Sequence, residues 1–435
     1  MGSKLSEPAV GAEYRRALDY LFARTQAGMK FGLERTEALL AHLGQPHRRY
    51  PSFHVAGTNG KGSTVATLAA LLSAGGRRVA AYTSPHLVDF RERVVVAGSP
   101  MPEADVVDWV ARHASTIEAL GATFFEATTA MAFDYFARAG AEVAVIEVGL
   151  GGRLDSTNVL DPVVAGVTSI GVDHAEYLGD TVEQIALEKA GIFKRGRPAV
   201  IGERDARIAA ILAGAAAAAA AAPIIQVQDA VPVQDVRVVD GGTRLRLTRG
   251  GAAMELRTPL AGEHQAQNLA TALAMLDAAG PEYALDAQAI AEAVLAVRLP
   301  GRFQRSGKWI FDVAHNPDGA RVLAETLVMV GVRRPLVALV GVLSDKDWLG
   351  MLRIIAPAVD RVILTTPPTA PATRIWDLAA ARERAAALSD NVDAISDFDE
   401  ALDRADSLGA TVLVTGSFHT VGDAMLRLQV SPMPG

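Results

Sequence analysis

The chain contains no cysteine among its 435 residues. Disulfide bonds, thiolate metal ligands and a cysteine nucleophile are therefore excluded, and any metal site must use oxygen atoms or imidazole rings. Apolar runs of about 18 residues, long enough to cross a membrane, are also absent. The first residues lack the extended apolar segment of a signal peptide, so we expect a cytoplasmic protein.

The chain also lacks a surplus of positive charge, since its formal net charge is -7. Nucleic acids and anionic membranes usually require a broad basic surface, so we expect neither as a partner. Any anionic ligand must be held by a local site. Hydrophobic residues make up 50% of the chain and charged residues 21%, which is enough for a large buried interior. The length suits two domains.

Short β-branched runs alternate with longer runs rich in alanine and leucine. This alternation predicts an α/β fold with a mainly parallel sheet of the P-loop type, followed by a smaller Rossmann-like α/β domain. We expect helices at residues 61–73, 103–120 and 125–139. The expected strands are residues 52–56, 78–83, 143–148 and 163–168 in the first series, and 309–313, 336–341, 362–365 and 411–415 in the second.

Residues 233–258 have a different texture, with three short alternating runs separated by glycine pairs. This pattern predicts a small antiparallel sheet, which we expect to be appended to the first domain. The Leu299-Pro300-Gly301 turn precedes the second α/β series. The predicted domains are therefore residues 1–298 and 299–435.

A glycine-rich segment lies between an expected strand and an expected helix. It consists of Gly57, Thr58, Asn59, Gly60, Lys61, Gly62 and Ser63. Glycines allow a tight turn whose N–H groups point at a phosphate, the helix N-terminus adds partial positive charge, and Lys61 can reach the outer phosphates. Gly62 separates the lysine from the serine, which departs from the usual P-loop pattern. The segment predicts a nucleotide site, and an ordinary glycine-rich turn is the alternative.

Glu147 ends an apolar strand that is expected to run toward this loop. A carboxylate at the C-terminal end of such a strand suits Mg²⁺, which prefers oxygen ligands. On its own, the residue is equally compatible with a surface glutamate.

The loop is followed by Thr83–Leu87, Phe90–Val94 and Ile146–Asn158. Together these segments resemble the folylpolyglutamate synthases and dihydrofolate synthases, relatives of the Mur ligases of peptidoglycan synthesis. The resemblance covers most of the chain. It continues, in the expected order, through Asp173-His174, Lys189–Ile192, His264–Asn268, Pro300–Phe303, Asp312–Pro317 and Gly416–Val421.

The resemblance implies an ATP- and magnesium-dependent ligase that adds L-glutamate to a carboxylate of folate or dihydropteroate through an acyl phosphate. ATP is expected between the two domains of a monomer, with two Mg²⁺ ions. The family pattern assigns Ser84 and Glu147 to the first ion and His174 and Lys189 to the second. It also implies that CO2 carbamylates Lys189, which requires a neutral amine and hence a lowered pKa.

The resemblance also implies roles for residues near the start of the second series. Asn268, Arg302, Asp312 and His315 are expected around the nucleotide, with Arg302 on phosphate and Asp312 on ribose. The expected catalytic residues are Lys61, Lys189, His174 and Arg302. The candidates for substrate binding are Pro85, His86, Arg91, Arg93, Phe124, Arg153, Asp155, Ser417 and His419. Among these, an aromatic residue such as Phe124 is also compatible with a core position, and Ser417 and His419 with structural roles.

Three alternatives compete with this interpretation. A Mur-type ligase acting on a UDP-linked peptide shares the chemistry, but Gly62, the Ser84-Pro85-His86 stretch and the lack of a separate domain before residue 57 disfavour it. A P-loop NTPase switch or motor leaves the segment from Asp312 to Pro317 unexplained. A nucleotide-binding module without catalysis is expected to lack Lys61, Glu147 or His174, and all three are present.

Overall fold

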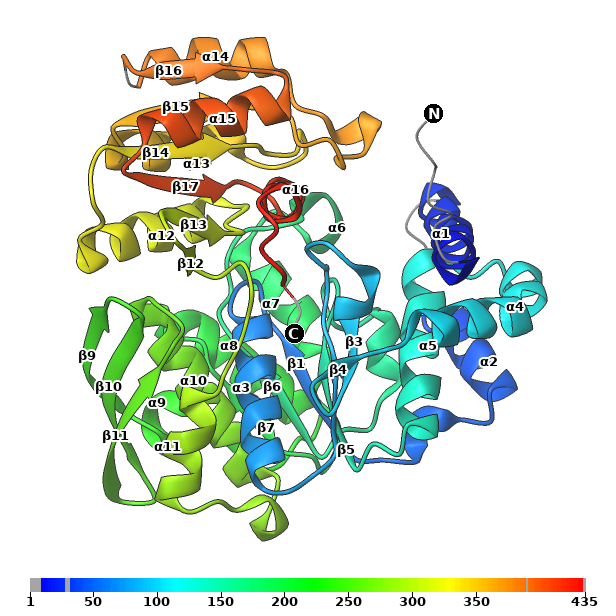
Figure 1. The fold of residues 1–435 in the computed structure, drawn as a ribbon. Coiled ribbons are helices and arrows are strands. Elements are labelled where there is room, and N and C mark those ends of the chain that lie inside the picture. Colours follow the sequence, from blue (N-terminus) through cyan, green and yellow to red (C-terminus); the bar gives the residue numbers. More distant parts are fainter. Residues whose placement is uncertain (1–8, 28–31, 389, 433–435) are drawn as a thin grey trace. The chain divides into compact units, whose positions relative to one another are not determined.

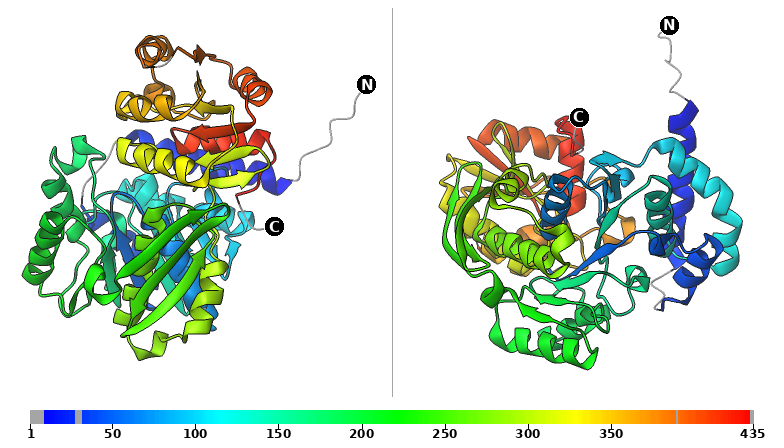
Figure 2. Two further views of the ribbon diagram at one scale, coloured as in Figure 1. Left: turned by 90° about the vertical axis from the view of Figure 1, so that its left-hand side faces the viewer. Right: turned by 90° about the horizontal axis from the view of Figure 1, so that it is seen from below.

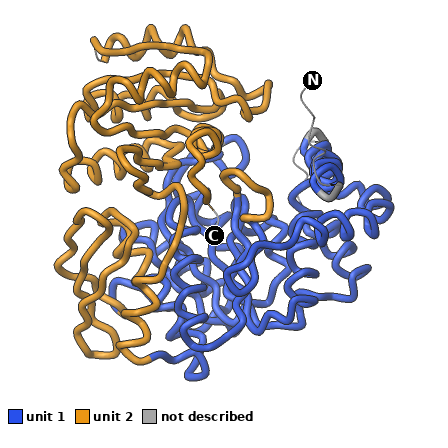
Figure 3. The backbone as a smooth tube through the Cα atoms, viewed as in Figure 1, with its two compact units in different colours: residues 1–84, 93–229, 271–285 blue, residues 85–92, 230–270, 286–435 orange. Residues whose placement is uncertain are grey.

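The computed structural model describes residues 9–27, 32–388 and 390–432. The chain has a mixed α/β fold and divides into two compact units, which Figure 3 shows in separate colours. The two units consist of several segments each. Unit 1 comprises Met1–Ser84, Arg93–Asp229 and Thr271–Leu285, and unit 2 comprises Pro85–Glu92, Ala230–Ala270 and Asp286–Gly435.

Unit 1 is built on an eight-stranded sheet with the order β4-β3-β2-β5-β1-β6-β7-β8 (Figure 1). The six strands from β2 to β8 in this order are parallel, while β3 and β4 form an antiparallel edge. The carboxyl ends of β2, β5, β1 and β6 therefore meet at one edge of the sheet. The strands are β1 Ser52–Ala56, β2 Val79–Tyr82, β3 Val94–Val96, β4 Ser99–Pro100, β5 Val143–Glu147, β6 Val164–Val167, β7 Ala199–Ile201 and β8 Ile224–Gln226.

Every residue of β1, β5 and β6 is buried. Strands of a parallel sheet are buried along their whole length in this way because helices cover both faces of the sheet. Helix α3 contacts β1, β2 and β5, and α8 contacts β7, β8 and α7. The helices of this part of the chain are α1 Ala9–Phe22, α2 Glu34–His42, α3 Lys61–Ala74, α4 Glu103–Leu120, α5 Phe124–Arg138, α6 Ala175–Leu178, α7 Val182–Ala190, α8 Ala206–Ala218, α9 Val227–Ala230 and α10 Glu263–Ala278.

Two of these helices begin with a capping box. Thr123 caps α5 together with Glu126, and Thr181 caps α7 together with Gln184. Each pair satisfies N–H groups that the first turn of a helix leaves without an intrahelical partner. The α5 capping box explains why this helix starts at Phe124, one residue before the predicted start.

Unit 2 contains a six-stranded sheet with the order β12-β13-β17-β14-β15-β16, in which only β12 is antiparallel. Alternate residues of its strands point to opposite faces. One face packs against α12, α13 and α14, and the other against α15 and α16. The elements are α11 Ala287–Leu295, β12 Gln304–Ser306, β13 Trp309–Asp312, α12 Pro317–Val330, β14 Leu336–Val340, α13 Trp348–Ile355, β15 Arg361–Leu364, α14 Leu378–Ala386, β16 Val392–Ala394, α15 Phe398–Leu408, β17 Thr411–Thr415 and α16 Phe418–Arg427.

The second sheet of unit 2 is a three-stranded antiparallel meander of β9 Val233–Val239, β10 Gly242–Arg249 and β11 Ala252–Thr258, visible as neighbouring green arrows in Figure 2. The predicted small antiparallel sheet is thus confirmed. The sequence interpretation attached it to the first domain, whereas the compact units group it with the C-terminal part of the chain. The sheet contacts helices on both sides of the predicted boundary: β11 contacts α11, which precedes residue 299, and β9 contacts α12, which follows it.

The predicted fold class is confirmed, and the predicted strands correspond to β1, β2, β5, β6, β13, β14, β15 and β17. The hairpin of β3 and β4 and the short strands β7, β8 and β16 were not predicted, because runs of two or three residues carry too little periodicity. No helix in the described residues is long and apolar enough to cross a membrane.

Candidate active site

The glycine-rich segment predicted to bind phosphate connects β1, near the middle of the unit 1 sheet, to α3. Its geometry requires glycine at two positions. Gly60 precedes α3 with φ 87°, and Gly57 has φ 150°. A Cβ atom on Gly57 would lie 1.8 Å from Oγ1 of Thr168. Larger residues would therefore open the turn or displace the strand end beside it.

The segment that follows β6 holds this loop in place. The Thr58 N–H donates to the Ser169 carbonyl at 2.8 Å, and the Thr168 hydroxyl donates to the Asn59 carbonyl at 2.7 Å. The Thr58 hydroxyl donates to the Gly171 carbonyl and accepts from the Gly171 N–H, both at 3.0 Å. The loop is thus fastened to a neighbouring strand and is preorganised for a ligand.

The Lys61 ammonium lies over the same turn. Its Nζ donates to the carbonyls of Gly57 and Thr58, each at 3.0 Å. The loop therefore combines a cation with the N-terminus of a 14-residue helix, whose first N–H groups lack intrahelical partners. This arrangement suits the phosphates of a nucleotide.

Glu147 and Ser84 come together at the carboxyl ends of neighbouring strands β5 and β2. The Ser84 N–H donates to Oε2 of Glu147 at 3.2 Å. The Glu147 side chain is buried, and β5 pairs with β1, the strand that leads into the phosphate loop. The buried carboxylate of Glu147 and the hydroxyl that Ser84 carries are hard oxygen donors of the kind that a divalent cation prefers. The residues present therefore fit a magnesium site.

Lys189 is almost fully buried in the last turn of α7, with 5% of its surface exposed. Burial, and secondarily the charge of Lys61, lowers the pKa of Lys189 to about 7, although Asp173 and Asp155 act in the opposite direction. The surroundings are tightly packed, since a Cβ atom on Gly152 would lie 2.8 Å from the Lys189 carbonyl oxygen. A substantial fraction of the amine is therefore neutral near pH 7.

His174 follows the β6 segment that holds the phosphate loop. Its φ is 53°, a left-handed conformation that is uncommon for a residue with a side chain. Its N–H donates to Oδ1 of Asp173 at 2.9 Å, and its Nε2 lies 3.9 Å from the same oxygen. Within the described residues, no group of three histidine, aspartate or glutamate side chains forms a ready-made metal cluster. The assignment of His174 and Lys189 to a second ion stays a prediction.

Asp155, predicted to face the substrate, organises its own loop. Its buried carboxylate accepts from the N–H groups of Leu150 and Thr157 and from the Thr157 hydroxyl, at 2.8, 3.0 and 2.5 Å. Because that hydroxyl donates to Asp155, it accepts from Nε2 of His54, 2.8 Å away on β1. Burial lowers the pKa of His54 to about 3, so the ring is neutral. The sequence interpretation missed His54, since only the fold brings β1 beside the loop that contains Thr157 and Asp155.

Phe124 and Arg93, both predicted to bind substrate, lie together in unit 1. The Arg93 guanidinium lies 5.4 Å from the centre of the Phe124 ring, and Phe22 stacks on the same ring at 5.1 Å. Arg153, another substrate candidate, forms an ion pair with Glu188 at 2.8 Å, and 55% of its side chain is exposed. Its partner therefore holds it only weakly, since exposed pairs contribute roughly 0–1 kcal/mol.

Unit 2 brings together three of the predicted nucleotide ligands. Asp312 ends β13 and accepts from the N–H groups of Phe303 and Ala314, both at 2.9 Å. Burial raises the pKa of Asp312, while the charge of Arg302 lowers it. Arg302 and His315 both contact the Phe418 ring, at 5.4 and 5.8 Å. An acid, a cation and an imidazole thus meet at the carboxyl end of β13.

The remaining predicted residues of unit 2 have structural contacts of their own. Asn268, buried on α10, donates to Oε1 of Gln265 at 3.1 Å. Ser417 caps α16 by accepting from the Thr420 N–H at 3.1 Å. His419 lies 2.9 Å from the Thr369 hydroxyl, and burial lowers its pKa. These contacts leave their binding roles as predictions.

The loop 85–92 contains the substrate candidates Pro85, His86 and Arg91. Glu92 shapes it, because its carboxylate accepts from the N–H groups of Leu87, Val88 and Asp89 at 2.8, 2.7 and 2.6 Å. The Arg91 guanidinium pairs with Asp89 at 2.8 Å, and the His86 ring contacts Phe90 edge-on at 6.2 Å. The sequence interpretation did not anticipate the role of Glu92.

This loop also packs closely on α16. A Cβ atom on Gly422, in the middle of that helix, would lie 1.9 Å from the Leu87 carbonyl oxygen. A Cβ on Gly301 would lie 3.0 Å from a methyl group of Val313 and 3.3 Å from one of Leu87. Only a residue without a side chain allows Leu87 to approach α16 so closely.

The site and the two α/β sheets define a class of protein. Residues 55–276 match the family profile of the Mur ligase middle domain, and residues 301–418 match that of the Mur ligase glutamate ligase domain. The chain belongs to the Mur ligase family, and within it to the dihydrofolate synthases and folylpolyglutamate synthases.

Comparison with similar proteins supports the assignment to the dihydrofolate synthases and folylpolyglutamate synthases. The dihydrofolate synthase/folylpolyglutamate synthase of Mycobacterium tuberculosis is 38% identical over 433 residues. The match covers 90% of this chain and 89% of that relative. A structure of M. tuberculosis folylpolyglutamate synthase with ADP superposes with a TM-score of 0.90 at 34% identity, covering 97% of this chain and all of that one. The Yersinia pestis bifunctional enzyme with AMPPNP and a Mn ion superposes with a TM-score of 0.83 at 35% identity, covering 98% and 100%.

The close packing of Leu87 on α16 generates a test with a matched control. Gly422→Ala inserts a methyl group against backbone, so we expect a loss of about 1–3 kcal/mol of stability and faster hydrogen exchange of the amides at residues 87–89. Gly214→Ala places the same methyl group in α8, where no atom lies within 4 Å, and should be neutral or stabilising. Equal behaviour of the two variants in hydrogen exchange and denaturation would contradict the packing.

The buried amine of Lys189 generates a pH-dependent prediction. The unfolded chain protonates this lysine up to its ordinary pKa of 10.5, the folded chain only below about 7. Between these values the unfolded state binds more protons, so this residue makes stability rise with pH. Relative to Lys189→Met, the wild type should gain up to about 1.4 kcal/mol per pH unit within that window. Parallel stability curves for the two proteins between about pH 7.5 and 9 would show that the amine is not perturbed.

Proposed function

We propose that the chain is an ATP-dependent ligase that joins L-glutamate to a carboxylate of folate or dihydropteroate through an acyl phosphate. The single observation that supports this most strongly is the phosphate loop at residues 57–63, which a neighbouring strand fastens in place and which contains Lys61. The family membership supplies the reaction class. Most of the chain is similar to proteins named for both the dihydrofolate and the folylpolyglutamate reaction, and we propose both activities here.

The nucleotide phosphates are assigned to the N–H groups of the loop and to the Lys61 ammonium. ADP and AMPPNP are named in the similar structures. In unit 2, Arg302 is assigned to phosphate, Asp312 to ribose, and His315 and Asn268 to the rest of the nucleotide. Arginine suits phosphate because its planar guanidinium donates two parallel hydrogen bonds. The carboxylate of Asp312 is held in place by two backbone N–H groups and suits a ribose hydroxyl.

Ser84 and Glu147 would hold a divalent cation, and a Mn ion is named in one similar structure. Held there, such an ion would supply positive charge to neutralise the charge that develops during phosphoryl transfer. We assign a second Mg²⁺ to His174 and a carbamylated Lys189. The lowered pKa of Lys189 supports this, because only a neutral amine reacts with CO2. The new carbamate adds oxygen donors at a buried position.

The chemistry requires positioning and charge neutralisation more than a protein nucleophile. The substrate carboxylate attacks the γ-phosphorus of ATP, ADP leaves, and an acyl phosphate forms. Lys61 and Arg302 stabilise the negative charge that spreads over the transferring group. The glutamate amine then attacks the activated carbonyl, loses a proton and expels phosphate, which leaves an amide bond.

The substrate side is assigned to two groups of residues. Phe124 and Arg93 present an aromatic face and a cation together, which suits a flat heterocycle with polar edges. Arg153, His86 and Arg91 would approach carboxylates, with Pro85 and Asp155 shaping their loops. Ser417 and His419 are assigned to the incoming glutamate. All of these residues belong to one chain, and we propose that it acts as a monomer.

Replacement of the loop lysine tests this function. Lys61→Ala removes the ammonium from the phosphates, so ATP-dependent phosphate release in the presence of glutamate and either dihydropteroate or a reduced folate should fall about 10²–10³-fold or more. Lys308→Ala, at an exposed ion pair with Asp406, serves as the control and should retain activity. Wild-type turnover in the Lys61 variant would refute the site. Comparing the two acceptors in the wild type decides which activities the chain has.

The carbamate has its own test. Lys189→Ala should abolish ligation, and short carboxylic acids such as acetate should partly restore it by supplying the missing oxygen ligands. Wild-type protein equilibrated with ¹³C-labelled CO2 should show a carbamate resonance that Lys189→Ala lacks. Wild-type activity in Lys189→Ala would contradict a role for the carbamate in the mechanism. Identical spectra of the wild type and the variant would contradict it as well.

A further inference from the structure

A row of three arginines crosses the exposed face of the small antiparallel sheet in unit 2. Strand β10 lies between β9 and β11 in this sheet (Figure 1). Arg244 on β10 lies directly opposite Arg237 on β9 and Arg257 on β11. All three residues are exposed, while their strand neighbours Leu245 and Leu256 point to the buried face. Neighbouring strands are about 4.8 Å apart, so the three cations are closely and regularly spaced.

Like charges directly opposite each other destabilise a sheet. The acidic residues of the sheet do not relieve this repulsion. Glu255 and Asp235 both pair with Arg246 in the next row, at 2.6 and 3.6 Å. Asp240 pairs with Arg305.

Within the described part of the chain, the structure shows no acidic partner for any member of the arginine row. The formal net charge of the whole chain is -7, so the row is a local cluster of positive charge on an acidic chain.

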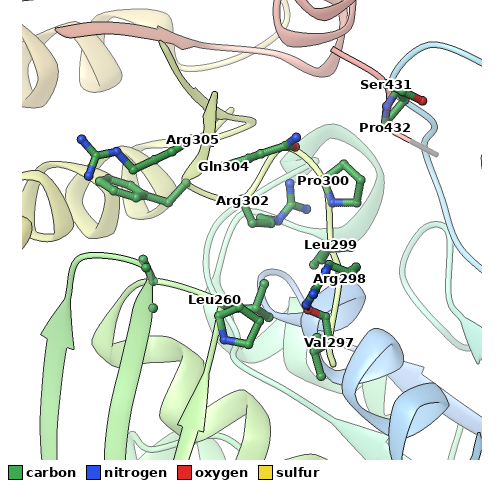
Figure 4. A pocket seen from close by; sticks show the side chains of 15 residues that line it. Leu260, Val297, Arg298, Leu299, Pro300, Arg302, Gln304, Arg305, Ser431 and Pro432 are labelled. Atoms are coloured by element: carbon green, nitrogen blue, oxygen red, sulfur yellow. The ribbon is translucent and has the colours of Figure 1, made fainter. Parts of the chain in front are cut away.

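One end of the row lies beside a cavity of about 390 Å³ in unit 2, shown in Figure 4. Gly241 lines this cavity, and a Cβ atom on Gly241 would lie 3.5 Å from Nη2 of Arg257. The described residues that line it include three arginines and no acidic residue. These arginines are Arg298, Arg302 and Arg305. One end of the arginine row therefore lies beside a cavity lined by further arginines, of which Arg305 is paired with Asp240.

We infer that Arg237, Arg244 and Arg257 bind the carboxylates along the poly-γ-glutamate tail of a folate substrate. This inference rests on the proposed function. Each γ-linked glutamate leaves one free α-carboxylate, so the tail is a flexible chain of evenly repeated anions. Guanidinium groups bind carboxylates through paired, charge-assisted hydrogen bonds.

The arginine row and the glutamate tail match in the opposite sign of their charges and in the regular spacing of those charges. A single narrow row suits one thin polyanion and is too small for a nucleic-acid duplex, which requires a broad basic surface. Exposed ion pairs of this kind weaken as salt increases. Binding of the tail to the arginine row should increase the affinity for long-tailed substrates and leave the chemical step unchanged. A monoglutamyl substrate has no inner tail carboxylates, so its kinetics do not depend on the row.

The test compares two triple variants that remove the same amount of charge from unit 2. Arg237→Gln, Arg244→Gln and Arg257→Gln together neutralise the row. The control, Arg353→Gln, Arg382→Gln and Arg384→Gln, neutralises exposed arginines on α13 and α14 that also lack a described acidic partner. The KM and kcat are measured for monoglutamyl and pentaglutamyl forms of one reduced folate. The row variant should raise the KM for the pentaglutamyl form about 10-fold, with kcat and the monoglutamyl KM unchanged. Added salt should reduce the difference.

Other outcomes overturn the inference: an unchanged pentaglutamyl KM, a rise of equal size for both substrates, or the same rise in the control variant. Thermal unfolding of both variants checks that the sheet remains folded.

Failure of the proposed function is recognised separately, because the wild type would then ligate glutamate to neither substrate. In that event, calorimetry at low salt measures whether free γ-linked pentaglutamate binds to the arginine row. Binding by the wild type and loss in the row variant support the inference, and no binding, or equal binding by both, refutes it. An oligonucleotide that binds the row more tightly than the tail does also overturns it.

Discussion

The attachment of the phosphate loop to the strand beside it is the interaction on which the rest of the site depends. Thr58 and Asn59 are bound to residues 168–171 through backbone and hydroxyl hydrogen bonds, so the loop cannot change shape without the end of β6. That segment leads to Asp173 and His174, and β5 on the other side of β1 ends at Glu147. One sheet edge thus fixes the phosphate cradle, the carboxylate and the imidazole relative to each other.

Burial and neighbouring groups control the charged residues of the site. Burial lowers the pKa of Lys189, and the charge of Lys61 lowers it further. In our proposal, neutral Lys189 reacts with CO2 and supplies oxygen donors, and Lys61 binds phosphate. The buried Asp155, held by three donors, supports the loop that packs on the end of α7. The unfavourable burial of these groups is therefore compensated by hydrogen bonds within unit 1 and, in our proposal, by anionic ligands.

Much of the fold and the core of the site were predictable from sequence, because they depend on local patterns. The phosphate loop has a turn-forming composition between a strand and a helix, and Glu147 follows an apolar run. Other features depend on contacts between distant segments. The neutral His54 acts on Asp155 only because β1 lies beside the loop after β5, Gly422 matters only because Leu87 packs against it, and the arginine row arises from strand register. Similarly, no local signal reveals that the three-stranded sheet packs on helices that follow residue 286.

The most direct test of the account is a crystal structure of this chain with a non-hydrolysable ATP analogue and Mn²⁺. We expect the β- and γ-phosphates to accept hydrogen bonds from the N–H groups of residues 58–63. We also expect Nζ of Lys61 to leave the carbonyls of Gly57 and Thr58 for a phosphate oxygen. Phosphates bound elsewhere, with Lys61 still on both carbonyls, would contradict the proposed role of the loop.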